Sequence, residues 1–329
     1  MKILLTGATG FIGSHLAEAL AHLGCEVRAL VRASSDCALL ERLNVEIFRG
    51  DLRDSAVVHS AVKNCGYVYH LAAQRTENGS SKKQYFATNI QGTANLARAA
   101  VAARVERFVY VSSTGVYGVL KQGTANENTK LRPNTYYRES KVLAEKTVLS
   151  SYRNEGLPAV IARVSGVMGP RSSSWLGLFR AIATGRFRSI DTGEKYSHIG
   201  YVTDIVNGLR RCAETRGIEG ECYLITGKEQ IKTKDLLGLI GEELGRDNRQ
   251  AGVPAAPFSA LIAAGQVLYR WLGYELPYAH RYEFFIKDNV FDISKAEKEL
   301  GYHPEVSVRE AIRRTIEWYR EQGYLKTLG

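Results

Sequence analysis

The chain begins with residues 2–13, KILLTGATGFIG, a short apolar run that leads directly into a turn containing three glycines. After the turn, Ile12, Leu16, Leu20 and Leu23 recur at the spacing of one helix face. Strand, glycine turn and helix in this order can bring a pyrophosphate close to the backbone and to the free N–H groups of a helix N-terminus. We therefore interpret this stretch as the start of a dinucleotide-binding domain, with a purely structural turn as the alternative.

Strand and helix patterns continue to alternate along the first half of the chain. The apolar runs are residues 26–31, 45–49, 67–71, 107–112 and 159–164, and the helical patterns between them include 89–103 and 137–154. This alternation predicts an α/β fold with a Rossmann-type doubly wound parallel sheet, which binds ligands at the carboxyl ends of its strands. We expect this domain to span residues 1–168.

The second half is expected to form a smaller, partly discontinuous substrate lobe. After Gly169 and Pro170 the periodicity weakens, and the serines that follow predict a loop between the lobes. We assign 169–196 and 216–329 to this lobe and expect 197–215 to return to the first domain. Strand-like runs at 198–202 and 222–225 suggest that the chain revisits the sheet, so that no single cut separates the lobes.

The chain of 329 residues is basic, with a net charge of +10. Its basic residues occur as scattered pairs, such as Lys82-Lys83 and Arg313-Arg314, without a long run or an RNA-binding signature. This distribution favours a solvated surface that attracts phosphate-bearing small molecules over a nucleic-acid partner. The five cysteines are odd in number and form no Cys-x-x-Cys pair, which predicts reduced thiols and no metal site.

No apolar run approaches the ~18 to 20 residues that a membrane-spanning helix needs. The apolar residues 3–5 are too few for a signal-peptide core, so we expect a cytoplasmic protein. Residues 257–274 are rich in apolar side chains but are interrupted by Gly265, Gln266 and Arg270. We interpret them as a packed helix of the smaller lobe, with an apolar substrate wall or a membrane-surface contact as alternatives.

Tyr137 and Lys141 are the candidate acid/base pair. Residues at i and i+4 share one helix face, so the ammonium can lie beside the phenol and lower its pKa from an ordinary value of about 10. A lower pKa would let the tyrosine exchange protons with an alcohol or ketone near neutral pH. Tyr117 and Lys121 have the same spacing, but a turn-like run with Gly118 separates them, and we treat that pair as a chance match.

The end of the second strand predicts which nicotinamide cofactor is bound. NAD sites usually place an acidic residue there to bind the ribose hydroxyls, whereas a nearby arginine accommodates the 2′-phosphate of NADP. Here Leu30-Val31 is followed by Arg32, with Ser34 and Ser35 as possible further partners of a phosphate. NADP is therefore favoured over NAD.

A series of motifs in this order resembles the extended short-chain dehydrogenase/reductases, the NAD-dependent epimerase/dehydratase family. The resemblance covers about the first 170 residues. Its motifs are the glycine turn TGATGFIG, Asp51-Leu52, His70-Leu71-Ala72-Ala73, Asn89-Ile90-Gln91-Gly92-Thr93, Ser112-Ser113-Thr114-Gly115-Val116-Tyr117-Gly118, Tyr137-x-x-x-Lys141, Arg163 and Gly169-Pro170.

The resemblance implies a role for each matching position. Ser113 would hydrogen-bond the substrate oxygen, Tyr137 would be the acid/base, and Lys141 would bind the nicotinamide ribose. Asp51 could instead cap the next helix, and Asn89 could bond only backbone; we expect His70 to be packed in a strand. The expected cofactor contacts are Gly7, Thr9, Gly10, Phe11, Ile12, Gly13, Arg32, Asp51, Leu52, Leu71, Ala72, Ala73, Asn89, Val111, Tyr137 and Lys141. The expected substrate contacts are Gln74, Thr114, Arg163, Gly166 and His198.

Departures from the family pattern narrow the expected reaction. Thr114-Gly115 follow Ser113 where sugar-nucleotide dehydratases carry Asp-Glu, and the glutamate of the related decarboxylases is also absent. The diphosphate-binding arginine of epimerases is missing before residues 201–204, although Lys195 or Arg171 could substitute. We therefore expect an NADP-dependent oxidoreductase that transfers hydride between nicotinamide and a secondary alcohol or ketone.

Two alternatives stay open, an NAD-dependent nucleotide-sugar 4-epimerase and a non-catalytic dinucleotide-binding regulatory protein. The substrate could be a nucleotide-sugar or a lipid-like compound, and the resemblance implies a homodimer.

Overall fold

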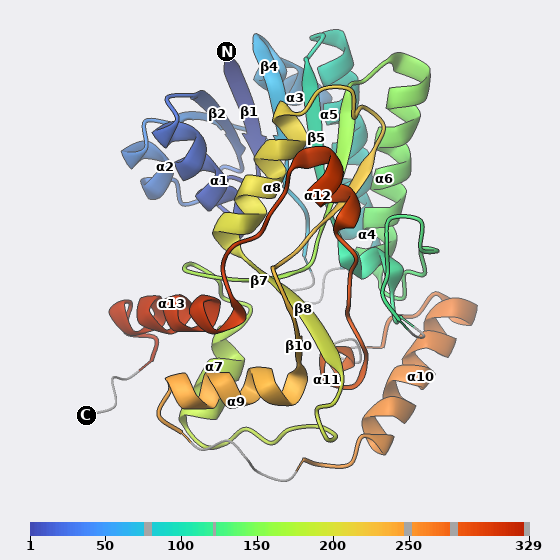
Figure 1. The fold of residues 1–329 in the computed structure, drawn as a ribbon. Helices are drawn as coiled ribbons and strands as arrows, with labels where there is room; N and C mark the ends of the chain where they lie inside the picture. Colours follow the sequence, from blue (N-terminus) through green and yellow to red (C-terminus); the bar gives the residue numbers. More distant parts are fainter. Residues whose placement is uncertain (76–80, 121–122, 247–251, 277–281, 326–329) are drawn as a thin grey trace.

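Within the described residues, seven parallel strands form the central sheet of this computed structural model, in the order β3-β2-β1-β4-β5-β6-β9 (Figure 1). The structure describes residues 1–75, 81–120, 123–246, 252–276 and 282–325. The strands are β1 (Lys2–Thr6), β2 (Glu26–Val31), β3 (Glu46–Arg49), β4 (Cys65–His70), β5 (Arg107–Ser113), β6 (Ala159–Val164) and β9 (Cys222–Ile225). The strand order reverses between β1 and β4, which confirms the doubly wound sheet and puts the switch point beside the glycine turn.

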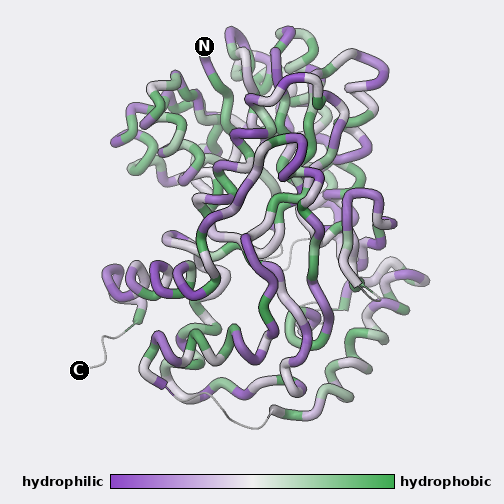
Figure 2. The backbone as a smooth tube through the Cα atoms, in the orientation of Figure 1, coloured by the Kyte–Doolittle hydropathy of each residue, from purple (hydrophilic) through white to green (hydrophobic). Residues whose placement is uncertain are grey.

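Helices cover both faces of this sheet. One face carries α1 (Phe11–His22) and α8 (Val202–Glu214), and the other carries α3 (Ser55–Val62), α5 (Gly92–Ala102) and α6 (Tyr136–Glu155). Successive strand side chains point to opposite faces: Ile3 and Leu5 join the core under α1 and α8, and Leu4 joins the core under the other helices. Figure 2 shows the hydrophobic stretches of the strands running between the more hydrophilic outer turns of the helices.

A second, smaller layer lies beyond the carboxyl ends of the strands. Its sheet has the order β10-β8-β7, with β7 (Gly166–Met168), β8 (Tyr196–Tyr201) and β10 (Gln230–Lys232). Its helices are α7 (Leu176–Ala183), α9 (Thr233–Glu243), α10 (Ala256–Leu272), α11 (Glu283–Ile286) and α13 (Val308–Glu321). The remaining elements are α2 (Ala38–Arg42), α4 (Lys82–Tyr85), the π-helical η1 (Phe86–Gln91), the 3-10 turn η2 (Thr114–Tyr117) and α12 (Ser294–Leu300).

The two strands predicted in the second half, at 198–202 and 222–225, belong to different sheets. Residues 222–225 become β9 and join the large sheet beside β6, so part of 216–329 belongs to that sheet. Residues 196–201 become β8, which pairs with β7 and β10 in the small sheet instead of returning to the large one. Helix α8, which follows β8, packs on β5 and β6 of the large sheet, and the chain then reaches the edge of that sheet as β9.

The helix expected from residue 89 begins earlier and in a different form. Phe86–Gln91 is a π-helix, and the regular α5 follows it. Such segments widen one turn and are often found at functional sites. In the described part of the chain, no helix is long and apolar enough to cross a membrane. All five cysteines are free thiols, and no three potential metal ligands cluster among the described residues.

Candidate active site

A cavity of about 1200 Å³ lies at the carboxyl ends of the parallel strands, between the large sheet and the smaller layer. It gathers most of the positions that the sequence singled out. The predicted residues that line it are Gly7, Thr9, Gly10, Phe11, Ile12, Gly13, Arg32, Asp51, Leu52, Leu71, Ala72, Ala73, Gln74, Val111, Ser113, Thr114, Tyr137, Lys141 and Gly166. Asn89, Arg163 and His198 are not among the residues that line it.

The glycine turn is packed so closely against neighbouring backbone that side chains larger than glycine would not fit at Gly7 or Gly13. Gly7 has a φ of +72°, and a Cβ there would lie 2.7 Å from the Ala72 nitrogen. At Gly13 a Cβ would lie 2.0 Å from the Gly7 oxygen. Helix α1 starts at Phe11 without a side-chain cap at Gly10, so its first N–H groups remain available at the cavity. This cradle fits the pyrophosphate of a dinucleotide.

Two arginines, Arg32 and Arg53, line the cavity near the ends of β2 and β3. Arg32 is exposed directly after β2, and Arg53, which lines the same cavity, lies beside Asp51. Arg53 Nη2 contacts Asp51 Oδ2 at 2.6 Å, and its hydrogen bonds lower the pKa of that carboxyl. Asp51 does not cap α3, since Asp54 accepts the N–H groups of Ala56 and Val57 instead. The sequence reasoning missed Arg53 because its place depends on the turn after Asp51.

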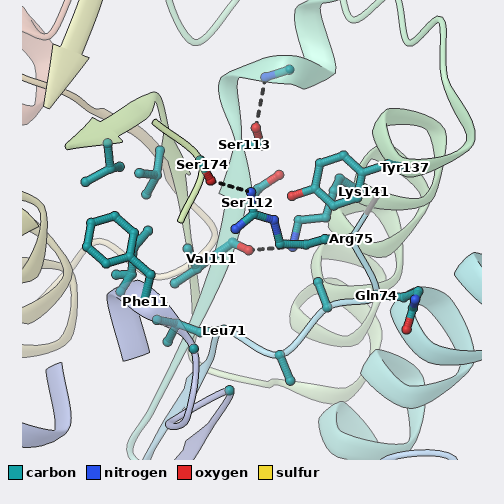
Figure 3. Close-up of a pocket in the computed structure, with 18 of the residues that line it drawn as sticks. Phe11, Leu71, Gln74, Arg75, Val111, Ser112, Ser113, Tyr137, Lys141 and Ser174 are labelled. Atoms are coloured by element: carbon teal, nitrogen blue, oxygen red, sulfur yellow. Dashed lines mark hydrogen bonds between the residues drawn. The ribbon is translucent and has the colours of Figure 1, made fainter. Parts of the chain in front are cut away.

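Ser113, Tyr137 and Lys141 meet in the middle of the cavity. Figure 3 shows Tyr137 and Lys141 projecting from α6 toward the end of β5, with Arg75 beside Tyr137. Lys141 is buried, and its Nζ donates to the Val111 carbonyl at 2.6 Å. The Ser113 hydroxyl oxygen accepts the Gly115 N–H at 3.1 Å, so its own proton can be donated to a ligand.

Helix α6 presents this pair because of its N-cap. The Thr135 side chain accepts the Arg138 N–H at 3.2 Å, and the helix begins one residue before Tyr137. Tyr137 therefore lies in the first turn, at the cavity, and Lys141 follows one turn deeper. In the other pair, Tyr117 is buried against Arg163, and Lys121 lies outside the described residues.

Burial dominates the acid/base properties of the pair. It raises the pKa of Tyr137, against the charges of Arg75 and Arg138. It also lowers the pKa of Lys141 to about 7, with the Glu145 carboxylate acting in the opposite direction. That Lys141 lowers the phenol pKa stays a prediction. The cations that act on the phenol are the two arginines, because the Lys141 ammonium is directed at Val111.

Asn89 acts behind the cavity wall. Its side-chain oxygen accepts the Gln74 N–H at 2.7 Å, and its amide nitrogen donates to the Gln74 carbonyl and, at 2.8 Å, to the Ser140 hydroxyl. Ser140 in turn donates to the Tyr137 carbonyl at 2.7 Å. Asn89 thus ties the loop after β4 to the first turn of α6, which extends the expected backbone role to a side-chain contact.

Arg163 and His198, expected at the substrate, are engaged elsewhere. Arg163 is buried in a bidentate ion pair with Glu145, at 2.7 Å, and also donates to the Tyr117 hydroxyl at 2.8 Å. His198 is hydrogen-bonded to the backbone carbonyls of Phe291 and Gly227, and burial lowers its pKa. Both side chains organise the scaffold around the cavity.

The substrate half of the cavity is lined by aromatic and aliphatic side chains. Trp175 donates its indole N–H to the Val167 carbonyl at 2.8 Å, and its ring meets Phe284 edge-on at 5.4 Å between centroids. Phe285 packs edge-on against Phe284 at 5.1 Å. Leu120, Leu178 and Phe291 complete this wall. The sequence reasoning missed it, although the adjacent pair Phe284-Phe285 in a mostly polar stretch was a possible signal.

The two cations proposed as substitutes for a diphosphate anchor are paired with acids. Arg171 Nη2 contacts Glu18 at 2.6 Å, and Lys195 contacts Asp288 at 3.3 Å. Neither lines the cavity. Arg138, which does line it, is paired with Glu283 at 2.6 Å. His70 is packed as expected, between the hydroxyls of Thr6 and Thr93.

The doubly wound sheet, the glycine cradle and the serine, tyrosine and lysine at one cavity define an extended short-chain dehydrogenase/reductase. The chain belongs to the NAD dependent epimerase/dehydratase family, whose sequence profile matches residues 3–226.

Its relatives cover nearly the whole chain. Sterol demethylase protein B of Methylococcus capsulatus is 31% identical over 335 residues, covering 99% of this chain and 100% of the relative. A 3 beta-hydroxysteroid dehydrogenase/Delta 5-->4-isomerase of Mycobacterium tuberculosis is 28% identical, with 97% of this chain and 90% of the relative covered. The crystal structure of UDP-glucuronic acid 4-epimerase from Bacillus cereus in complex with NAD is 25% identical, with a TM-score of 0.79 over 99% of this chain and all of that chain.

Proposed function

We propose that the chain is an NADP(H)-preferring oxidoreductase that interconverts a secondary alcohol and a ketone carried on an apolar framework. The observation that carries this proposal is the convergence of Ser113, Tyr137 and Lys141 between a dinucleotide cradle and an aromatic wall. The bound nicotinamide supplies or accepts the hydride at the substrate carbon. The protein's task is then to hold the substrate oxygen and to move one proton.

Ser113 donates a hydrogen bond to the substrate oxygen, and the Tyr137 phenol gives its proton to that oxygen during reduction. Burial raises the pKa of Tyr137, so that the phenol holds its proton until the substrate oxygen takes it during hydride transfer. Oxidation of the alcohol reverses the transfer, and the arginines beside the phenol then stabilise its ionised form. Lys141, buried below the phenol, is available to the cofactor ribose.

NADP is favoured because Arg32 and Arg53 flank the end of the cavity where Ser35 also lies. A 2′-phosphate there would meet two guanidinium groups, of which Arg53 shares its charge with Asp51. An acid at the end of β2, the usual partner of the NAD ribose, is replaced by Arg32.

The apolar character of the substrate follows from the wall. Trp175, Phe284 and Phe285 offer ring faces and edges, and the cations Arg171 and Lys195 lie outside the cavity in ion pairs. A nucleotide diphosphate would bring two negative charges to this wall, whereas a fused-ring or long-chain ketone would bury apolar surface against it. One relative is named for a steroid dehydrogenase activity, which agrees with this substrate class.

The nucleotide-sugar epimerase is the second candidate, because a relative of nearly the same length is such an enzyme and binds NAD. An epimerase retains its cofactor and shows no net change in nicotinamide absorbance. The regulatory alternative would bind a dinucleotide without turnover. The family resemblance further favours a homodimer in the cytoplasm, which sedimentation of the purified protein and cell fractionation would test.

The test begins with release and identification of any nucleotide that co-purifies, followed by titration with NAD, NADH, NADP and NADPH. We expect an empty site that prefers NADPH, and oxidation of NADPH when cyclic or long-chain ketones are added. Tightly held NAD, with conversion of a UDP-sugar to its epimer and no net redox change, would contradict the proposal and favour the epimerase. Binding without turnover of either substrate class would favour the regulatory protein.

A further inference from the structure

Helix α10 carries apolar side chains both on the side that packs against this chain and on its exposed surface, which is here called its outer side. The inner side carries Phe258 and Ile262, which pack with Ile190 and Ile286. The outer side faces solvent, with exposed fractions of 37% at Leu261, 56% at Val267, 75% at Trp271 and 74% at Leu272. A helix that is apolar all round is normally covered on all sides. In Figure 1, α10 lies at the edge of the smaller layer.

In the described part of the chain, the exposed charged side chains beside α10 are basic. Helix α10 contains no acidic residue, and its one charged side chain, Arg270, is exposed. At its start, exposed Arg188 adjoins Ser189, whose carbonyl accepts the Val253 N–H at 2.8 Å, and half-buried Asp191 donates its backbone N–H to the Val253 carbonyl at 2.9 Å. At its end, on the inner side, Lys82 lies over the ring of Tyr136, which adjoins Tyr269 of α10.

The nearby acids are turned inward. Glu139 accepts a hydrogen bond from the Tyr269 hydroxyl and forms an ion pair with Lys82 at 3.4 Å. Glu275 accepts the Tyr136 N–H at 2.8 Å. The outer side of α10 is therefore an apolar stripe, and exposed Arg270 and Arg188 beside it form its basic border.

The same helix is joined to the active site on its inner side. The Tyr136 hydroxyl donates to the Gly273 carbonyl at 2.6 Å. Gly273 directly follows α10, and Tyr136 directly precedes Tyr137. Phe258 and Ile262 pack in the cluster that includes Phe285, and Phe285 lines the substrate wall. A surface that covers the outer side of α10 would thus lie directly behind the apolar half of the cavity.

We propose that the outer side of α10 lies on the surface of an anionic phospholipid bilayer. The stripe ends in Trp271 and Tyr274, ring types that favour the boundary between water and lipid, and the basic residues beside it complement acidic headgroups. A two-fold contact with a second copy would instead bring two basic borders together, which like charges oppose. The helix is too short and interrupted to span the bilayer, so the contact is peripheral.

The experiment is co-sedimentation of the full chain with vesicles of phosphatidylcholine alone or mixed with phosphatidylglycerol. We expect binding to the mixed vesicles that weakens as salt is raised, since the basic border is screened. The double variant Trp271→Glu/Leu272→Glu should bind at least about tenfold more weakly, because two carboxylates would enter the interface. Leu23→Glu is the matched control, since Leu23 is 55% exposed at the end of α1 and should leave binding unchanged.

Thermal melting and NADPH titration of each variant show whether it is folded, and Val267→Glu provides a second change on the same side. Failure of the native chain to sediment with either vesicle, or equal binding to both, would overturn the proposal. So would a dimer in the native chain that the double variant dissociates, because α10 would then be covered by a second copy. None of these outcomes depends on whether the chain reduces a ketone.

Discussion

The cofactor side and the substrate side of the cavity are built in different ways. The cofactor cradle consists largely of backbone. Its glycines lie within seven consecutive residues, and an added Cβ at Gly7 or Gly13 would collide with neighbouring backbone. The substrate wall is made of side chains from positions as far apart as Trp175 and Phe285, brought together by the small sheet and α11. Cofactor recognition is therefore local in the sequence, and substrate recognition depends on the whole fold.

For cofactor binding, the largest effect is expected from closing the cradle. In Gly13→Ala the new methyl group would lie 2.0 Å from the Gly7 oxygen, so the turn must open and NADPH affinity should fall by about 100-fold or more. Gly238→Ala is the matched control, because a Cβ in that helix meets nothing within 4 Å. Fluorescence titration with NADPH measures both, and unchanged affinity in Gly13→Ala would contradict the assignment of the turn.

A second prediction concerns the scaffold that both sides share. Arg163→Met would leave Glu145 buried without its cation, which should lower the free energy of unfolding by about 3–5 kcal/mol. Arg313→Met removes an exposed arginine from α13 and should cost about 1 kcal/mol or less. Chemical denaturation measures both values. A small loss in Arg163→Met would show that Arg163 is not the structural residue described above.

On the substrate side, Trp175→Ala should raise the KM for an apolar ketone by about tenfold or more, because a large ring leaves the wall. The affinity for NADPH should stay within about twofold, since the cradle is separate. Trp271→Ala, which removes an exposed indole outside the cavity, serves as the control in vesicle-free assays. Equal KM values for the two variants would refute the aromatic wall as the substrate site.

These differences explain what could be predicted from the sequence. The glycine turn, the strands and the first turn of α6 are specified by neighbouring residues, and the structure has them at the expected places. Arg163 lies in a predicted strand, but its partner Glu145 is set by how α6 crosses the sheet, which no local pattern reveals. The separate paths of β8 and β9 likewise depend on packing of α8.

The smallest effect is expected at the edge of the cofactor site. Arg32→Ala should weaken NADPH by about tenfold and leave NADH nearly unchanged, because only NADPH carries the 2′-phosphate. Arg42→Ala, an exposed arginine of the adjacent α2 that does not line the cavity, should change neither. Isothermal titration with both nucleotides compares the variants. Equal losses for NADPH and NADH would remove the argument for NADP.

Tyr137 is expected to transfer the proton, and the cofactor side and the substrate side of the cavity are expected to stay intact without its hydroxyl. Single-turnover oxidation of NADPH by an accepted ketone, in the native chain and in Tyr137→Phe, tests it most directly. Loss of the hydroxyl should slow the reaction by about 10²–10⁴-fold. NADPH binding should be retained, because the ring still fills its place on α6. A Tyr137→Phe rate near that of the native chain would contradict the account.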